Sequence, residues 1–180
     1  SKAEEVLKEI RERIERIRKR AEDVLRHDEE SLKRAEEVNR KMEKESRRIN
    51  EEIRDRVRKE GGRDKEKVDR LLEELHRVDE ESIRIVERLL EHNRKSTEDI
   101  KDEVRKLLER LKEVIDEVRR AGVDEKDVRK VEDDIRRVIK KLKEELDRSA
   151  DKSRDVVRRL RDSNKKLNDK NRRDIEEIKK

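Results

Sequence analysis

The spacing of the apolar residues constrains what this chain can fold into more than any other feature of its sequence. Leu7, Ile10 and Ile14 are separated by three and then four residues, and this alternation continues to Ile53 with polar interruptions and one pair of consecutive four-residue steps. Such a spacing places the apolar side chains on one face of a helix that packs lengthwise against other helices. The same alternation recurs over residues 68–118 and 128–171. The pattern therefore predicts three long amphipathic helices.

The residues that break helices indicate where these helices end. The chain has no proline, and its glycines stand only at positions 61, 62 and 122. We expect helices over residues 2–60, 65–120 and 125–179, joined by loops so short that neighbouring helices run antiparallel. Ser1 with Glu4 has the spacing of a capping box, and Asp64 and Asp124 are the expected N-caps of the next two helices. The predicted fold is all-α, a long, coiled-coil-like, antiparallel up-down-up three-helix bundle that forms a single domain over residues 1–180.

Composition excludes several classes of function. Of the 180 residues, 61% are charged and 28% are hydrophobic, and none is Phe, Trp or Tyr. Enzyme pockets and base-stacking surfaces usually depend on aromatic side chains, so we predict no enzyme activity and no cofactor. The chain has no cysteine and no long apolar run, so we expect no disulfide, membrane span or targeting signal, and a soluble protein that stays in the cytoplasm of an expression host. The net charge of +5 is a small remainder of 57 basic and 52 acidic residues, and it predicts no specific nucleic-acid partner.

The polar residues that interrupt the apolar faces fall at shared levels of the predicted bundle. If the chain turns around Gly62, residues at one level of the first and second helices have numbers that sum to about 124. If it turns again around Gly122, residues at one level of the second and third helices have numbers that sum to about 245. The first predicted polar layer contains His27, Asp28, Ser31, His92, Asn93, Ser96, Ser149 and Ser153. The second contains Ser46, Asn50, His76, Asp79, Ser82, Ser163, Asn164 and Asn168, with Asn39 nearby and Asn171 as a further candidate.

Such layers favour one arrangement of the helices over others. A buried polar group without a partner costs about 1–3 kcal/mol, so polar residues at one level are expected to hydrogen-bond to one another. A shifted register would break those bonds, and the layers would thereby specify register and topology. The alternative is that Ser and Asn at flanking positions are simply solvated. Asp28, Asp79 and Asn93 fit that alternative least, because they occupy central positions of the alternation.

The three histidines, His27, His76 and His92, are the side chains that ordinarily titrate near neutral pH. If they are buried in the neutral form, acid would charge them inside the bundle and open it or dissociate an oligomer. Carboxylates at Asp28 and Asp79 would reverse the effect of acid, because they would favour the imidazolium form. The alternative is that the histidines are ordinary network members at half-exposed flanks. No two histidines are three or four residues apart, so we predict no metal site.

The first half of the second helix carries a wider apolar arc than the rest of the chain. Leu71, Val78 and Ile85 extend its central stripe to one side. Such flanking positions are usually half-buried in a three-helix bundle. The alternative is an exposed groove, which would allow self-association or the binding of a designed partner helix.

Four features of the sequence occur together: Gly-Gly and Gly-Val-Asp loops, a small set of residue types, a surface dominated by charged residues, and two polar layers. In these features the whole chain resembles computationally designed helical bundles with buried hydrogen-bond networks. The resemblance implies a structural scaffold, or a component of a designed assembly or pH-responsive switch, with no natural substrate. It transfers no functional residue to this chain. The chain departs from such designs in having only five alanines and no aromatic residue.

Overall fold

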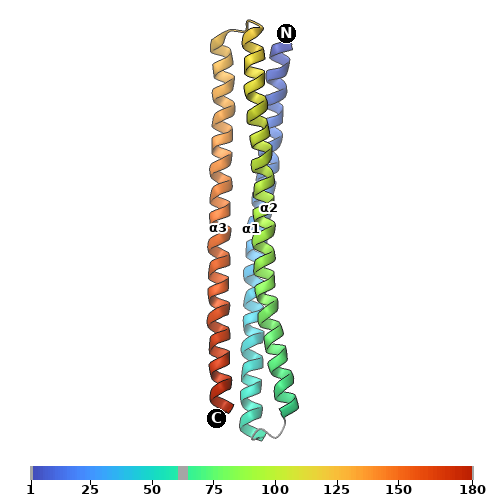
Figure 1. Ribbon diagram of the computed structural model, residues 1–180, viewed down its shortest axis with the longest axis vertical. Coiled ribbons are helices and arrows are strands. Elements are labelled where there is room, and N and C mark those ends of the chain that lie inside the picture. Colours follow the sequence, from blue (N-terminus) through green and yellow to red (C-terminus); the bar gives the residue numbers. More distant parts are fainter. Residues whose placement is uncertain (1, 61–64, 180) are drawn as a thin grey trace. The chain divides into compact units, whose positions relative to one another are not determined.

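Three helices make up the computed structural model, which describes residues 2–60 and 65–179. α1 spans Lys2–Glu60, α2 spans Lys65–Arg120 and α3 spans Glu125–Lys179. The helices pack as a bundle in which consecutive helices run in opposite directions (Figure 1). The predicted all-α, three-helix fold class is therefore confirmed. The caps expected at Ser1 and Asp64, and the glycines at positions 61 and 62, lie outside the described residues.

The end of α2 follows from Gly122. Its φ of +78° lies in the left-handed region, which glycine adopts readily because it has no Cβ atom. The Gly122 N–H donates to the Arg119 carbonyl at 3.2 Å, and the Val123 N–H donates to the Val118 carbonyl at 3.4 Å. These two bonds form a Schellman cap, which satisfies carbonyl groups that the end of a helix otherwise leaves open.

α3 begins at the N-cap that the sequence predicts. The Asp124 carboxylate accepts the Lys126 backbone N–H at 3.2 Å, and the Asp124 carbonyl accepts the N–H groups of Asp127 and Val128, each at 3.1 Å. A carboxylate at this position also faces the positive end of the helix dipole. The predicted N-cap at Asp124 is confirmed.

The chain divides into two compact units, and each contains one segment of every helix. Unit 1 consists of Ser1–Glu29 and His92–Lys152, and unit 2 consists of Glu30–Glu91 and Ser153–Lys180. Within the described part of the chain, no helix has an apolar stretch long enough to cross a membrane.

A continuous apolar cluster fills the interior of unit 1. Side chains such as Leu107, Leu111 and Leu146 are completely buried. The cluster also contains Leu7, Ile10, Ile14, Ile17, Ala21, Ile100, Val104, Val114, Ile115, Val118, Val128, Ile135, Ile139 and Leu142. The alternation of three and four residues therefore produces a conventional apolar core in this unit.

Unit 2 has a smaller apolar cluster and a more polar interior. The buried members of its cluster are Ile49, Ile53, Leu75 and Ile175. Partly buried residues pack against them, namely Val57, Val68, Leu71, Leu72 and Val78. Elsewhere in unit 2 the buried positions include asparagine and serine as well as apolar residues such as Leu32, Val86 and Val156.

Candidate functional site: the buried polar networks

A first hydrogen-bond network in unit 2, the Asn39 network, joins all three helices. The Ser82 hydroxyl donates to Asn39 Oδ1 at 2.7 Å and accepts a bond from Asn164 Nδ2 at 2.9 Å. Asn39 Nδ2 donates to Glu43 Oε1 at 3.1 Å, and the Ser163 hydroxyl donates to the same oxygen at 2.6 Å. Because Ser163 and Asn164 are neighbours on α3, the network passes from α3 to α2 and α1 and returns to α3.

A second network in unit 2, the Asp79 network, also connects the three helices. Asn171 Nδ2 on α3 donates to the Ser46 hydroxyl on α1 at 2.8 Å, and this hydroxyl donates to Asp79 Oδ1 on α2 at 3.2 Å. With its amide nitrogen turned toward the carboxylate, Asn168 donates to Asp79 Oδ1 at 2.9 Å and to Oδ2 at 2.8 Å. The carboxylate is thus surrounded by donors from α1 and α3, which suits an acceptor with four lone-pair sites.

Burial is the main influence on the pKa of Asp79. Desolvation raises this pKa above its ordinary value, whereas the hydrogen bond from Ser46 and the charge of His76 lower it. Donors such as Ser46 and Asn168 favour the ionised carboxylate because they point hydrogen atoms at it. The Asp79 network therefore offsets part of the free energy that burying this carboxylate costs.

A third polar contact in unit 2 involves only α1 and α3. Asn50 Nδ2 donates to Asp174 Oδ2 at 3.2 Å, and Arg54 Nη1 lies 3.9 Å from the same oxygen. The sequence places Asn50 in the second polar layer, but the structure separates it from the two networks. It lies on α1 one turn beyond Ser46, at the level of Asp174.

The residues of the first predicted layer differ widely in burial. Asp28, Asn93 and Ser153 are buried, Ser31, Ser96 and Ser149 are half-buried, and His27 and His92 are exposed. Ser31 and Ser153 belong to unit 2, and the other six residues belong to unit 1. Thr97, which the same arithmetic places at this level, is buried as well.

Asp28 is the most unusual polar group of unit 1. Its side chain is 1% exposed, and neither carboxylate oxygen accepts a hydrogen bond from the part of the chain that the structure describes. Burial raises the pKa of Asp28 from 3.8 to about 6, and the nearby charges of His27 and His92 oppose this rise. The site thus holds a carboxyl group that is protonated more easily than an ordinary aspartate.

The histidines lie at the outside of the helices. The rings of His27 and His92 are in contact, with centroids 5.5 Å apart and planes inclined by 58°. The side chain of His76 is 75% exposed, and its Nε2 lies 3.0 Å from Glu80 Oε1 on the same helix. His76 does not join the second layer, because Leu75 takes the inward position and successive helical residues differ in direction by about 100°.

Sequence reasoning missed two carboxylates of these sites, Glu43 and Asp174. Both resemble the many surface carboxylates of the chain. The available signal for Glu43 was its position four residues after Asn39, on the same face of α1. The signal for Asp174 was its position three residues after Asn171 on the inner side of α3.

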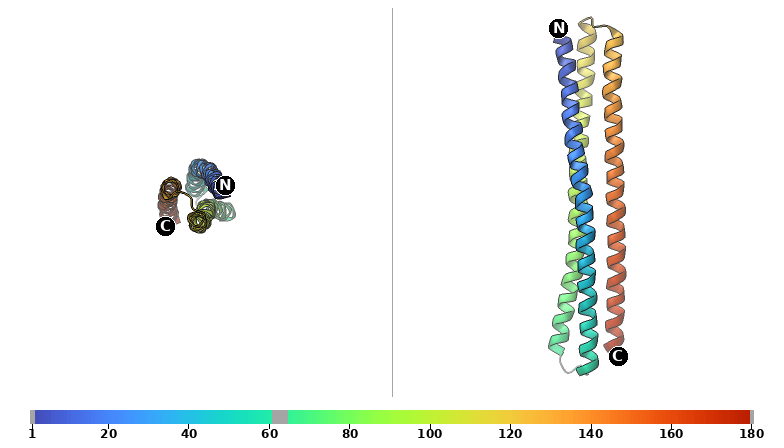
Figure 2. Two further views of the ribbon diagram at one scale, coloured as in Figure 1. Left: turned by 90° about the horizontal axis from the view of Figure 1, so that it is seen from above. Right: turned by 180° about the vertical axis from the view of Figure 1, so that it is seen from behind.

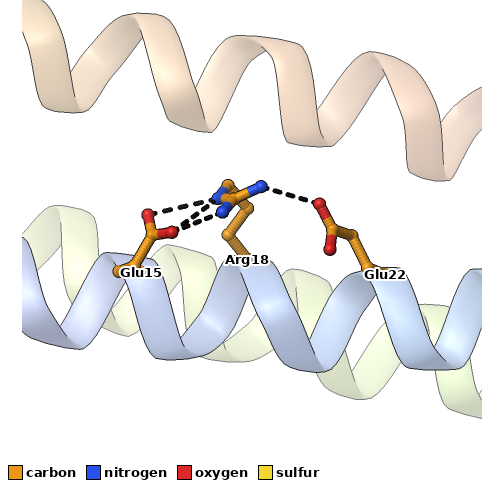
Figure 3. A network of polar contacts seen from close by, with 3 residues as sticks. All are labelled: Glu15, Arg18 and Glu22. Atoms are coloured by element: carbon orange, nitrogen blue, oxygen red, sulfur yellow. Dashed lines mark hydrogen bonds and ion pairs between the residues drawn. The ribbon is translucent and has the colours of Figure 1, made fainter.

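Ion pairs cover the outside of the helices. Figure 3 shows Arg18 between Glu15 and Glu22 on α1, with 2.7 Å between Arg18 Nη1 and Glu22 Oε1. The hydrogen bond from Arg18 lowers the pKa of Glu15. Pairs between helices also occur in unit 1, such as Lys101 with Asp147 at 2.8 Å. Exposed pairs of this kind contribute at most about 1 kcal/mol each, so they solubilise the helices more than they stabilise the fold.

No group of three or more His, Cys, Asp and Glu side chains in the described residues could hold a metal ion. No protein family matches the chain, and no curated protein matches it. A solved structure described as a computationally designed three-helix bundle is similar to it. The two chains share 18% sequence identity over 98% of this chain and 87% of that chain, with a TM-score of 0.45.

Proposed function

We propose that this chain is a designed structural scaffold whose register and topology are specified by its buried polar networks. The observation that carries the proposal is that the Asn39 and Asp79 networks each link all three helices within unit 2. A helix displaced by two turns would move its residues by about 11 Å and separate the donors from their acceptors. An apolar core would tolerate such a displacement better, because apolar contacts have no direction.

The composition supports the same proposal. The helices contain few residue types and carry charged residues at nearly every outward position. This composition is typical of a chain selected for folding and solubility rather than for binding a ligand. In its finer form, the proposal includes the level of Asp28 and Asn93 as a further polar layer. His27 and His92 would be its outer members.

Replacing a whole network with apolar residues tests the proposal. We expect the triple variant Asn39→Leu, Ser82→Ala, Asn164→Leu to remain helical while populating more than one register or assembly. The single variant Asn39→Leu keeps Ser82 and Glu43 but removes their partner, so it should lower the free energy of unfolding by about 1–3 kcal/mol. Urea denaturation measures the stability, and backbone amide NMR spectra with sedimentation reveal additional conformers and masses.

Asn50→Leu is the matched control for this experiment. Asn50 is 5% exposed, like the network residues, but its contact with Asp174 does not reach α2. Its replacement should leave the amide resonances and the mass at each concentration as they are in the wild type. A triple variant that also keeps the wild-type resonances and masses would contradict the proposed role of the networks.

A second candidate function, a response to pH, is favoured by the position of Asp28 beside His27 and His92. We propose that the response resides in Asp28 and that acid strengthens the structure. Burial raises the pKa of Asp28, so the folded chain binds a proton at this carboxyl group more tightly than the unfolded chain does. Because His27 and His92 are exposed, the acid-driven opening expected for buried neutral histidines has no physical cause here.

A further inference from the structure

A groove lies between α1 and α2 in unit 2. The ribbon of α2 leans away from that of α1 toward the N-terminal end of α2 (Figures 1 and 2). Its volume is about 720 Å³, and its apolar lining comes from Val38 and Met42 on α1 and Val78 on α2. All three side chains are half-buried. The groove therefore offers apolar surface that a further helix would remove from water.

The apolar surface of α2 continues on both sides of the groove. Leu71, Val78 and Ile85 are half-buried and follow one another at intervals of seven residues. This row is symmetric about Val78. Against an antiparallel second copy centred near this position, Val78 would meet Val78, and Leu71 would meet Ile85.

The charges at the rim have the same symmetry. On α1, Lys41 precedes Glu45 by four residues, and on α2, Arg77 precedes Glu81 by four residues. Within the residues that the structure describes, neither Lys41 nor Arg77 makes an ion pair. A two-fold axis across the groove would place each of these cations opposite the corresponding anion of a second copy.

We propose that this groove is a homodimer interface, in which a second copy of the chain docks antiparallel with α1 against α1 and α2 against α2. The axis would pass near residue 43 on α1 and near residue 79 on α2. These numbers sum to 122, close to the value of about 124 that places residues of α1 and α2 at one level. Both rims can therefore form their pairs in a single complex.

The available area suits such a dimer. The α2 segment of unit 2, residues 65–91, is about 40 Å long, and two neighbouring helices are about 20 Å wide. A face of this size buries about 800 Å² on each copy, which is the standard size of a stable protein interface. The inference goes beyond the scaffold proposal and does not rest on it, because none of the four rim charges belongs to the Asn39 or Asp79 network.

Sedimentation equilibrium of the full chain tests the proposal. The wild-type mass should rise with concentration from 22.0 kDa toward twice that value. The variant Lys41→Glu, Arg77→Glu places like charges opposite one another and should weaken self-association about tenfold or more. The variant Glu45→Arg, Glu81→Arg should do the same. An equimolar mixture of the two variants should restore dimers, because opposite charges then meet across the axis.

Lys106→Glu, Lys140→Glu is the matched control, since it makes the same change in net charge at exposed positions of unit 1. It should dimerise like the wild type, and circular dichroism should show unchanged helicity in every variant. A wild-type mass that stays at one chain at all concentrations would overturn the proposal. It would also be overturned if the control lost as much affinity as the rim variants, or if the mixture failed to restore dimers.

Discussion

Asp28 combines near-complete burial with the absence of any hydrogen bond from the described residues to its carboxylate, and this combination predicts a pH dependence. Its pKa of about 6 lies above the ordinary value of 3.8, so the folded chain binds this proton more tightly than the unfolded chain. The associated stabilisation is complete below about pH 4 and is lost as the pH rises through 6. We expect Asp28→Asn to remove this loss. The free energy of unfolding of the variant minus that of the wild type should therefore increase by about 2–3 kcal/mol between pH 4 and pH 7.

Urea denaturation of both proteins across this pH range measures the difference. Asp23→Asn serves as the control, because Asp23 lies on the same helix with its side chain 77% exposed. Its difference from wild type should change little with pH. If the Asp28→Asn difference were equally flat, the buried carboxyl would not be the titrating group.

Individual site residues were only partly predictable from the sequence. Central positions of the three-four alternation indicate burial of Asp28 and Asn93, because a helix has a fixed angular repeat. The alternation says much less about positions one residue away, and there His76 points outward beside Leu75. Partners such as Glu43 depend on rotamers and on the exact level of the neighbouring helix, which no sequence period specifies.

At the scale of the helix ends, Gly122 predicts a specific loss of stability on substitution. A Cβ atom at this position would have no neighbour within 4 Å, so the cost of a side chain is backbone strain alone. Gly122→Ala should therefore lower the free energy of unfolding by about 1–2 kcal/mol. Gly122→Asn should cost less, because asparagine tolerates the left-handed conformation better than alanine. Chemical denaturation of the two variants checks the order, and equal stability of alanine and glycine would contradict it.

The helices themselves were more predictable than their contacts. Strong helix formers, an absence of proline and a glycine at the α2–α3 turn leave few alternatives to three helices. The sequence could not show how far α2 would lean from α1 in unit 2, since this depends on how the side chains between the two helices pack rather than on their spacing along the chain. The sequence also placed Asn39 only near the second polar layer, although Asn39 accepts a hydrogen bond from Ser82 of that layer.

For the whole molecule, the sequence predicts a single domain over residues 1–180, and the two units provide a way to test that prediction. Unit 1 contains a continuous apolar cluster, whereas unit 2 has a small one and fills much of its interior with hydrogen-bonded polar groups. Apolar burial contributes about 25 cal/mol per Å², and a typical internal hydrogen bond adds only about 1 kcal/mol net. We therefore expect the amides of unit 2 to open at lower free energy than those of unit 1.

Matched Leu→Ala variants with native-state hydrogen exchange distinguish the two outcomes. Leu75 belongs to the cluster of unit 2 and Leu107 to that of unit 1, and both are buried. Each cavity should cost about 2–5 kcal/mol. If unit 2 opens first, Leu75→Ala accelerates exchange in residues 65–91 and leaves the slowest amides of unit 1 nearly unchanged, whereas Leu107→Ala accelerates those slowest amides. Equal acceleration throughout the chain by both variants would show instead that the three helices unfold as one cooperative unit, as a single domain requires.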